Sequence, residues 1–180
     1  MEVKVIRSDR KTIALEIGAD GLVVRAPRRV SNAQIEEFLQ KHRRWIEIHT
    51  AREAAVSSLP KLTSAELSEL AARGKTVFAE RAAFYAPQVG VTYGRITVRT
   101  QRSRWGSCSA KGNLSFNCLL LLAPPEVLDS VVVHELCHRK EMNHSSRFYD
   151  EVLRVCPDYR KWYGWLRENG RGLMARLPER

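Results

Sequence analysis

The segment HELCH at residues 134–138 constrains this chain more than any other stretch, because it places two histidines around a glutamate. On a helix, residues four apart share one face, so both imidazoles can reach one metal ion. The intervening Glu135 then lies beside the metal-bound water as a general base. His144 follows six residues after His138, too far along to share that face, and must return to the ion after the helix ends.

Three histidine ligands with one open position describe a catalytic zinc site rather than a closed structural one. We therefore predict Zn²⁺ as the cofactor, His134, His138 and His144 as its ligands, and Glu135 as the catalytic residue. In the expected reaction Glu135 takes a proton from the zinc-activated water and delivers it to the leaving amine. The pattern thus predicts zinc-dependent hydrolysis.

The flanking sequence places this motif on a buried helix. Pro124-Pro125 marks a helix start, and an apolar face follows at Leu128, Val131 and Leu136. A strand over 96–100, a loop over 101–111 and a second strand over 112–122 precede it. The expected elements elsewhere are strands within 2–27, a helix from 32 to 52, a helix capped by Thr63 and Glu66 that ends at Ala86-Pro87, a helix from about 145, and a last helix from Asp158 to Gly170.

Length and composition favour one soluble domain. The chain has 180 residues, and no apolar run approaches the roughly 20 residues needed to span a bilayer. The first residues lack the hydrophobic core of a signal peptide, so we expect a cytoplasmic protein. The four cysteines (Cys108, Cys118, Cys137 and Cys156) form no close pair and are expected to be free and mostly buried.

The net charge of +10 makes nucleic acid a candidate partner, although the arginines are spread along the chain and a merely soluble basic surface is the simpler reading. The densest basic group, just before the metal region, is Arg99, Arg102, Arg104 and Lys111. Trp162, Tyr163 and Trp165 have near-helical spacing and are interpreted as core residues rather than a base-stacking platform.

The sequence resembles the YgjP-like metallopeptidase family, which looks related to the WLM and SprT-like zincins. The resemblance is carried by VVHELCH at 132–138, by EMNHS at 141–145, and by RWGSC at 104–108 with Gly112 and Asn117 downstream. It is specific from about residue 95 to 167 and looser before that. The resemblance implies a zincin-like α+β fold, with an HExxH helix packed against a β-sheet and the same metal ligands and catalytic glutamate.

The third ligand has an alternative. The spacing from His138 to His144 also matches metzincins, but this chain has Glu141 where a metzincin has glycine, and no Met-turn is evident. Asn143 is a candidate for the left-handed conformation that such a turn needs. In a gluzincin arrangement, a distal glutamate such as Glu151 or Glu168 would replace His144.

Other active-site roles remain open at this level. Arg104, Arg147 and Tyr149 are candidate donors to the oxyanion, and none is preferred over a surface or packing role. The strand 96–100 is the candidate edge for an extended peptide. Trp105 and Ser107 either line the cleft or belong to a loop that packs on the core.

We interpret residues 1–180 as a single metallopeptidase domain, with strands and helices over about 1–90 and a zinc-binding core over about 91–170. The function expected is zinc-dependent cleavage of a peptide or protein substrate. The alternatives are a zinc hydrolase of nucleotide phosphoanhydrides, suggested by the basic cluster, and a DNA-associated protease or binding module. No membrane partner is expected, and the sequence does not indicate the oligomeric state.

Overall fold

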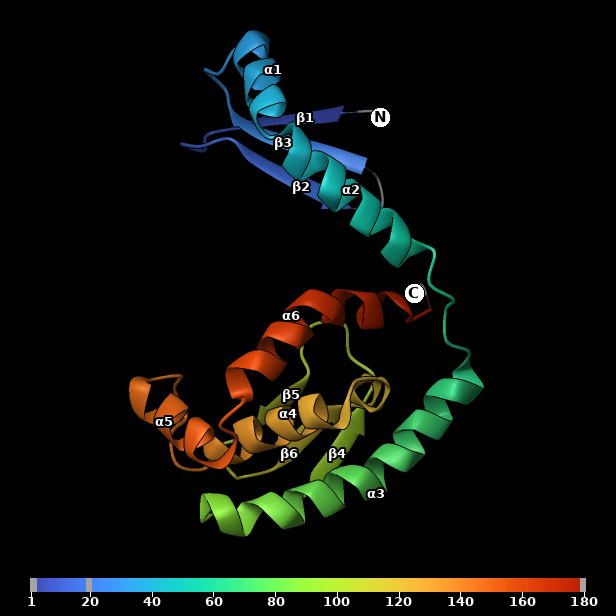
Figure 1. Ribbon diagram of the computed structural model, residues 1–180, viewed down its shortest axis with the longest axis vertical. Helices are drawn as coiled ribbons and strands as arrows, with labels where there is room; N and C mark the ends of the chain where they lie inside the picture. The colour runs from blue at the N-terminus through green and yellow to red at the C-terminus, as the bar shows by residue number, and fades with distance from the viewer. Residues whose placement is uncertain (1–2, 19–20, 179–180) are drawn as a thin grey trace. The chain divides into compact units, whose positions relative to one another are not determined.

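A computed structural model describes residues 3–18 and 21–178, and the chain divides into two compact units, Met1–Leu59 and Pro60–Arg180 (Figure 1). Each unit contains a three-stranded sheet and helices, so the predicted α+β class is confirmed. The helix that begins after Thr63 belongs to the second unit, together with the HExxH segment. That the whole chain acts as one metallopeptidase domain stays a prediction.

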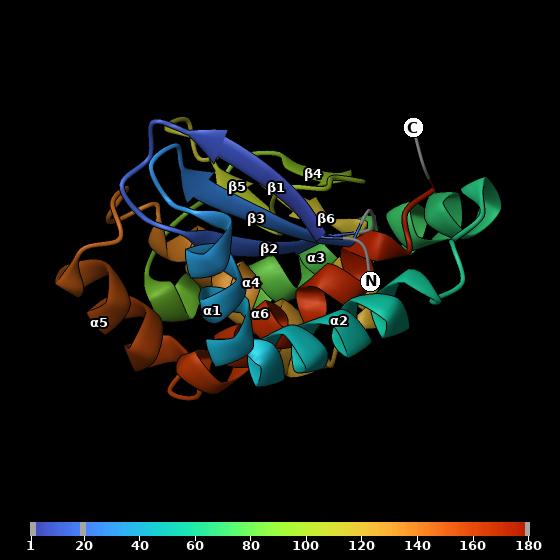
Figure 2. The same ribbon diagram turned by 90° about the horizontal axis from the view of Figure 1, so that it is seen from above.

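The first unit pairs a small sheet with two helices. Its elements are β1 (Val3–Ser8), β2 (Ala14–Gly18), β3 (Gly21–Pro27), α1 (Asn32–Lys41) and α2 (Arg43–Ser57). Figure 2 shows β3 between β1, to which it is parallel, and β2, to which it is antiparallel. Val24, Ala26 and Ile35 form the core. The single helix predicted over 32–52 is wrong, because the backbone leaves helical geometry at His42 and α2 then continues to Ser57.

The second unit begins with the long helix α3 (Ser64–Val89), whose start agrees with the sequence. Thr63 accepts a hydrogen bond from the backbone of Glu66, and the Glu66 carboxylate accepts one from the backbone of Thr63. The predicted end at Ala86-Pro87 is wrong. Pro87 lies inside the last turn, and the helix closes at Gly90, whose φ of +80° needs a glycine.

The sheet of the second unit contains β4 (Ile96–Arg99), β5 (Gly106–Cys108) and β6 (Leu114–Asn117) in the order β4-β6-β5. The predicted loop over 101–111 therefore contains a strand, β5. The predicted strand over 112–122 stops at Asn117 and continues as a 3₁₀ turn, Cys118–Leu122. Asn117 causes this change: its side chain accepts from the backbone of Leu119 and donates to the carbonyl oxygens of Gln101 and Arg104.

Three further helices, α4 (Pro125–Cys137), α5 (Ser146–Val155) and α6 (Tyr159–Ala175), complete the second unit. The helix α4 packs against α3, β5, α5 and α6, which buries nearly all of its length. Arg81 on α3 forms a bidentate ion pair with Asp129 on α4, with both N···O distances 2.6 Å. The HExxH helix is thus fixed from several sides before any ligand binds.

The predicted stop of the last helix at Gly170 is wrong, since α6 continues to Ala175. Gly170 serves close packing instead: a Cβ there would lie 2.8 Å from Cζ2 of Trp105. Within residues 3–18 and 21–178, no helix is both long and apolar enough to cross a membrane. All four cysteines are free as predicted, with Cys118 and Cys137 buried and Cys108 and Cys156 partly buried.

Candidate metal centre

The three histidines of the sequence motif converge. One nitrogen from each of His134, His138 and His144 lies within 4.8 Å of the other two. The Nε2 atoms of His134 and His144 are 3.0 Å apart. Two nitrogens that each lie roughly 2.0–2.1 Å from one tetrahedral zinc are about 3.3 Å apart, so this spacing needs only a small adjustment to accommodate an ion. The donor set fits a borderline-soft metal with imidazole preference.

Local structure explains how His144 joins the pair on α4. The helix ends at Cys137, and the amides of Lys140 and Glu141 both donate to the Cys137 carbonyl, which folds the chain back. His144 then lies just before Ser145, the N-cap of α5. The predicted left-handed Asn143 is wrong, because no non-glycine residue described has a positive φ. The loop reverses through its hydrogen-bonded turn and needs no such residue.

Both histidines on α4 are oriented through their second ring nitrogen. Nδ1 of His134 lies 2.8 Å from the phenolic oxygen of Tyr159, and Nδ1 of His138 lies 3.1 Å from the carbonyl oxygen of Glu141. With Nδ1 protonated and donating in each case, Nε2 is left as the free lone pair for a metal. Outer partners of this kind are typical of metal-binding histidines.

Tyr159 is the site residue that the sequence did not reveal. It is 5% exposed and comes from the first turn of α6, a helix separated from α4 by the whole of α5. Its ring also stacks near His134, with centroids 5.9 Å apart. The only local signal was an aromatic residue at the start of a helix, which does not indicate a contact with the HExxH segment.

Burial sets the charge of the histidines on α4. It lowers the pKa of His134 to about 3, with smaller contributions from His138 and His144, because a charged imidazole is poorly solvated there. Burial also lowers the pKa of His138, and repulsion from His144 adds to this. Both rings are therefore neutral near pH 7, the form that binds metals.

Glu135 is 5% exposed, and its Oε2 atom is buried without a hydrogen-bond partner. Burial raises the pKa of this carboxyl to about 8, and the positive charge of Arg104 opposes the shift. The strand β5 makes room for the side chain, since a Cβ at Gly106 would lie 2.5 Å from Oε1 of Glu135. A buried carboxyl with an unpartnered oxygen is costly for the fold alone and suits a group that acts on a ligand.

The strand beside Glu135 is β5, and it is an edge strand. The strand over 96–100 is an edge strand as expected, but β4 lies at the opposite edge of the sheet from β5, with β6 between, and its pairing with a peptide stays a prediction. The sequence missed β5 because this strand has only three residues, too few for a visible alternation. The edge relevant to a ligand at Glu135 is therefore that of Gly106–Cys108.

The other candidate residues differ in how they lie relative to the histidine cluster and Glu135. Arg104 acts electrostatically on Glu135, whereas among the residues that the structure describes no contact joins Arg147 to the histidine cluster. Tyr149 is 40% exposed, with its ring 6.2 Å from that of His144. Glu151 is occupied by ion pairs to Lys140 and Arg154, both at 2.9 Å, and so is not placed as a third metal ligand.

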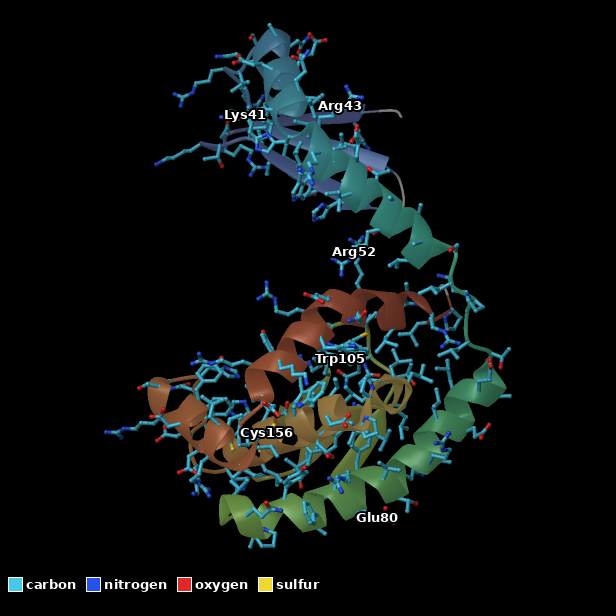
Figure 3. All side chains as sticks on the ribbon, in the orientation of Figure 1. Lys41, Arg43, Arg52, Glu80, Trp105 and Cys156 are labelled. Carbon is cyan, nitrogen blue, oxygen red and sulfur yellow. The ribbon has the colours of Figure 1, made fainter. Side chains whose placement is uncertain are left out.

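A cavity of about 190 Å³ adjoins His134 and Glu135. Trp105 both lines this cavity and packs on the core, so the two alternatives for this residue are not exclusive. Figure 3 shows its side chain between α6 and α4. Tyr163, interpreted from sequence as core, is 49% exposed and also lines the cavity.

Comparison with known proteins agrees with this geometry. No curated protein matches the chain. Among solved structures, the metallopeptidase zymogen abylysin of Pyrococcus abyssi is similar over 49% of this chain and 90% of its own, with 21% identity and a TM-score of 0.46. A family model, the YgjP-like metallopeptidase domain, matches residues 11–70 and 56–169, which include every residue of the histidine cluster. The chain therefore belongs to the YgjP-like metallopeptidase family.

Proposed function

We propose that this protein is a zinc-dependent peptidase of the HExxH type, in which His134, His138 and His144 hold the ion and Glu135 is the general base. The observation that carries the proposal is the convergence of three imidazole nitrogens within 4.8 Å, together with a buried carboxyl that has an unpartnered oxygen and lines one cavity with His134. A hydrolytic site needs both parts: an ion with an open position and a group that moves a proton.

Zinc bound to the three imidazoles would supply a Lewis acid that activates water and polarises the substrate carbonyl. Glu135 accepts the proton of the attacking water and then donates it to the leaving nitrogen. Burial raises the pKa of this carboxyl to about 8 in the absence of a cation, and the charge of a bound ion would favour the carboxylate form that accepts a proton. Arg104 is the favoured candidate among the three predicted oxyanion donors, since its charge already acts at this carboxyl.

The free edge of β5 is suited to hold the substrate main chain. The strand pairs with β6 on one side, and the sheet order gives it no strand on the other. An extended peptide added there would run past Gly106, whose missing side chain leaves Glu135 in contact with the strand. The substrate would thus be positioned by backbone hydrogen bonds.

The test is the substitution Glu135→Gln in zinc-loaded protein, assayed on a peptide mixture. We expect kcat to fall by about 10²–10⁴-fold, the usual contribution of a general base. The metal content, measured by plasma mass spectrometry, should stay near one zinc per chain. Glu126→Gln is the matched control, because Glu126 is an exposed carboxylate on the same helix. Unchanged activity of Glu135→Gln would refute the role of this residue.

A further inference from the structure

The cavity beside the catalytic centre has a chemical character that the proposed reaction does not require. It is bounded by β5 and its preceding loop, by α4 and by α6. The residues that line it are Trp105, Gly106, Ser130, Val131, His134, Glu135, Tyr159, Tyr163 and Leu166. Except for Glu135 and its neighbour His134, the walls are aromatic, aliphatic or small, and no lysine or arginine is among them.

Apart from the Glu135 carboxyl, whose Oε2 atom has no partner, the polar groups of Ser130, His134 and Tyr159 in these walls are already hydrogen-bonded. The hydroxyl of Ser130 donates to the carbonyl of Val127 at 2.7 Å. Nδ1 of His134 and the hydroxyl of Tyr159 are hydrogen-bonded to each other. A polar group placed deep in the cavity would find few free partners and would lose its hydration without compensation. An apolar group would lose nothing of this kind and would gain by leaving water.

The size of the cavity suits one side chain rather than a whole small molecule. Its volume is about 190 Å³, below the roughly 300–1,000 Å³ of pockets that hold complete small ligands. Trp105 forms one wall because Gly170 allows its ring to lie directly against α6. Tyr163, half exposed and stacked on Tyr159 with centroids 5.7 Å apart, lies where the cavity meets solvent.

We propose that this cavity binds one large apolar side chain, such as that of phenylalanine, leucine or methionine, from the residue next to the cleaved bond. The inference rests on the proposed peptidase function for the position of that bond. The cavity contacts Glu135 and His134 directly, so a side chain inside it belongs to a residue adjacent to the reacting carbonyl. Trp105, Val131 and Leu166 would then determine specificity.

The first test maps cleavage sites in an equimolar peptide library with zinc-loaded protein and mass spectrometry. One position flanking the cleaved bond should favour large apolar residues over alanine by at least about tenfold in kcat/KM. Val131→Phe fills the cavity from α4 and should shift the preference to alanine and serine with zinc content unchanged. Cleavage without any preference at either flanking position, or with preference for a charged residue, would overturn the proposal.

Because Val131 is buried, its substitution can disturb folding, and a second variant guards against this. Tyr163→Ala removes an exposed ring at the cavity edge and should reduce the apolar preference several-fold while the fold is retained. Phe84→Ala is the matched control, since Phe84 is an exposed aromatic on α3 that does not line the cavity. Equal effects of the two substitutions would count against the cavity.

A binding measurement separates this inference from the proposed function. N-acetylphenylalanine amide should shift the Trp105 indole resonance in NMR spectra, which Trp105→Phe identifies, and N-acetylglutamate amide should not. If no peptide is cleaved but the phenylalanine amide still binds, the peptidase function fails and the apolar site stands. If peptides are cleaved but this probe leaves Trp105 unchanged, the function stands and the site is refuted.

Discussion

The phenolic oxygen of Tyr159 lies 2.8 Å from Nδ1 of His134 and links the first turn of α6 to the HExxH helix. The bond orients the His134 ring, whose Nε2 lies 3.0 Å from Nε2 of His144. The same tyrosine is buried, and burial raises the pKa of its hydroxyl, which therefore stays protonated at neutral pH. The histidine cluster is thus held by residues from α4, the loop before α5, and α6.

Removing this hydroxyl should weaken metal binding. For Tyr159→Phe we expect zinc affinity to fall by about 10- to 100-fold, as is usual when a ligand loses its outer hydrogen-bond partner. Nδ1 of His134 would also be left unpaired in a buried position. Competition with a chromophoric chelator measures the affinity. Tyr163→Phe, a hydroxyl deletion one turn further along α6, should leave it unchanged; equal affinities of wild type and Tyr159→Phe would contradict the prediction.

Adding one methyl group at Gly106 should disable Glu135. The new Cβ would lie 2.5 Å from Oε1, 2.7 Å from Cγ and 2.9 Å from Cδ of that glutamate, so the side chain must move. For Gly106→Ala we expect kcat/KM to fall by about 10²-fold, the effect of displacing a catalytic group by about 1 Å, with zinc retained. Gly164→Ala is the control, because nothing lies within 4 Å of its added Cβ. Full activity of Gly106→Ala would exclude this close approach.

The HExxH helix and its convergence with His144 could be predicted because they depend on local sequence. Helical spacing fixes two imidazoles, and a loop of few residues returns the third. The contacts made by Tyr159 and Gly106 could not be predicted in the same way. They depend on α6 and β5 packing against α4 from distant parts of the chain, and such tertiary contacts leave no periodic signal.

The predicted ends of some helices and strands are wrong for a related reason. Gly170 was interpreted as a helix stop, although it lies inside α6 to make room for Trp105. Asn117 was interpreted as a strand residue, although its side chain ends β6 by binding three backbone groups. In both cases the residue type was informative, but its role depended on a partner elsewhere in the fold.

The stability of metal-free protein should depend on pH through Glu135. The pKa of Glu135 is about 8 in the folded state against an ordinary 4.5, so the folded protein binds this proton more tightly than the unfolded chain does. This contribution is complete below about pH 4.5 and is lost as pH rises through about 8. Glu135→Gln cannot ionise and should gain stability over wild type across that range, measured as Tm in the presence of a chelator.

His134 affects the pH dependence of stability in the opposite direction to Glu135. Its pKa is about 3 when folded against an ordinary 6.5, so its contribution is present above pH 6.5 and is lost as pH falls toward 3. Wild type and Glu135→Gln share this effect of His134, so it cancels in the difference between their Tm values. A difference in Tm that stays constant from pH 4.5 to 8 would show that Glu135 is not desolvated in the folded protein.

Metal removal should abolish activity and lower thermal stability together. A ligand that binds only the folded state stabilises it by about 2.7 kcal/mol at a free concentration of 100 times Kd, so chelation should lower Tm and added zinc should restore it.

His144→Ala should weaken zinc binding by more than the roughly 10- to 100-fold expected when an outer hydrogen-bond partner is lost. His49→Ala is the control, because His49 stacks on Trp45 in the first unit and is outside the histidine cluster. Glu168→Gln tests the remaining alternative ligand: if this variant loses zinc and His144→Ala keeps it, a distal glutamate completes the centre and His144 does not.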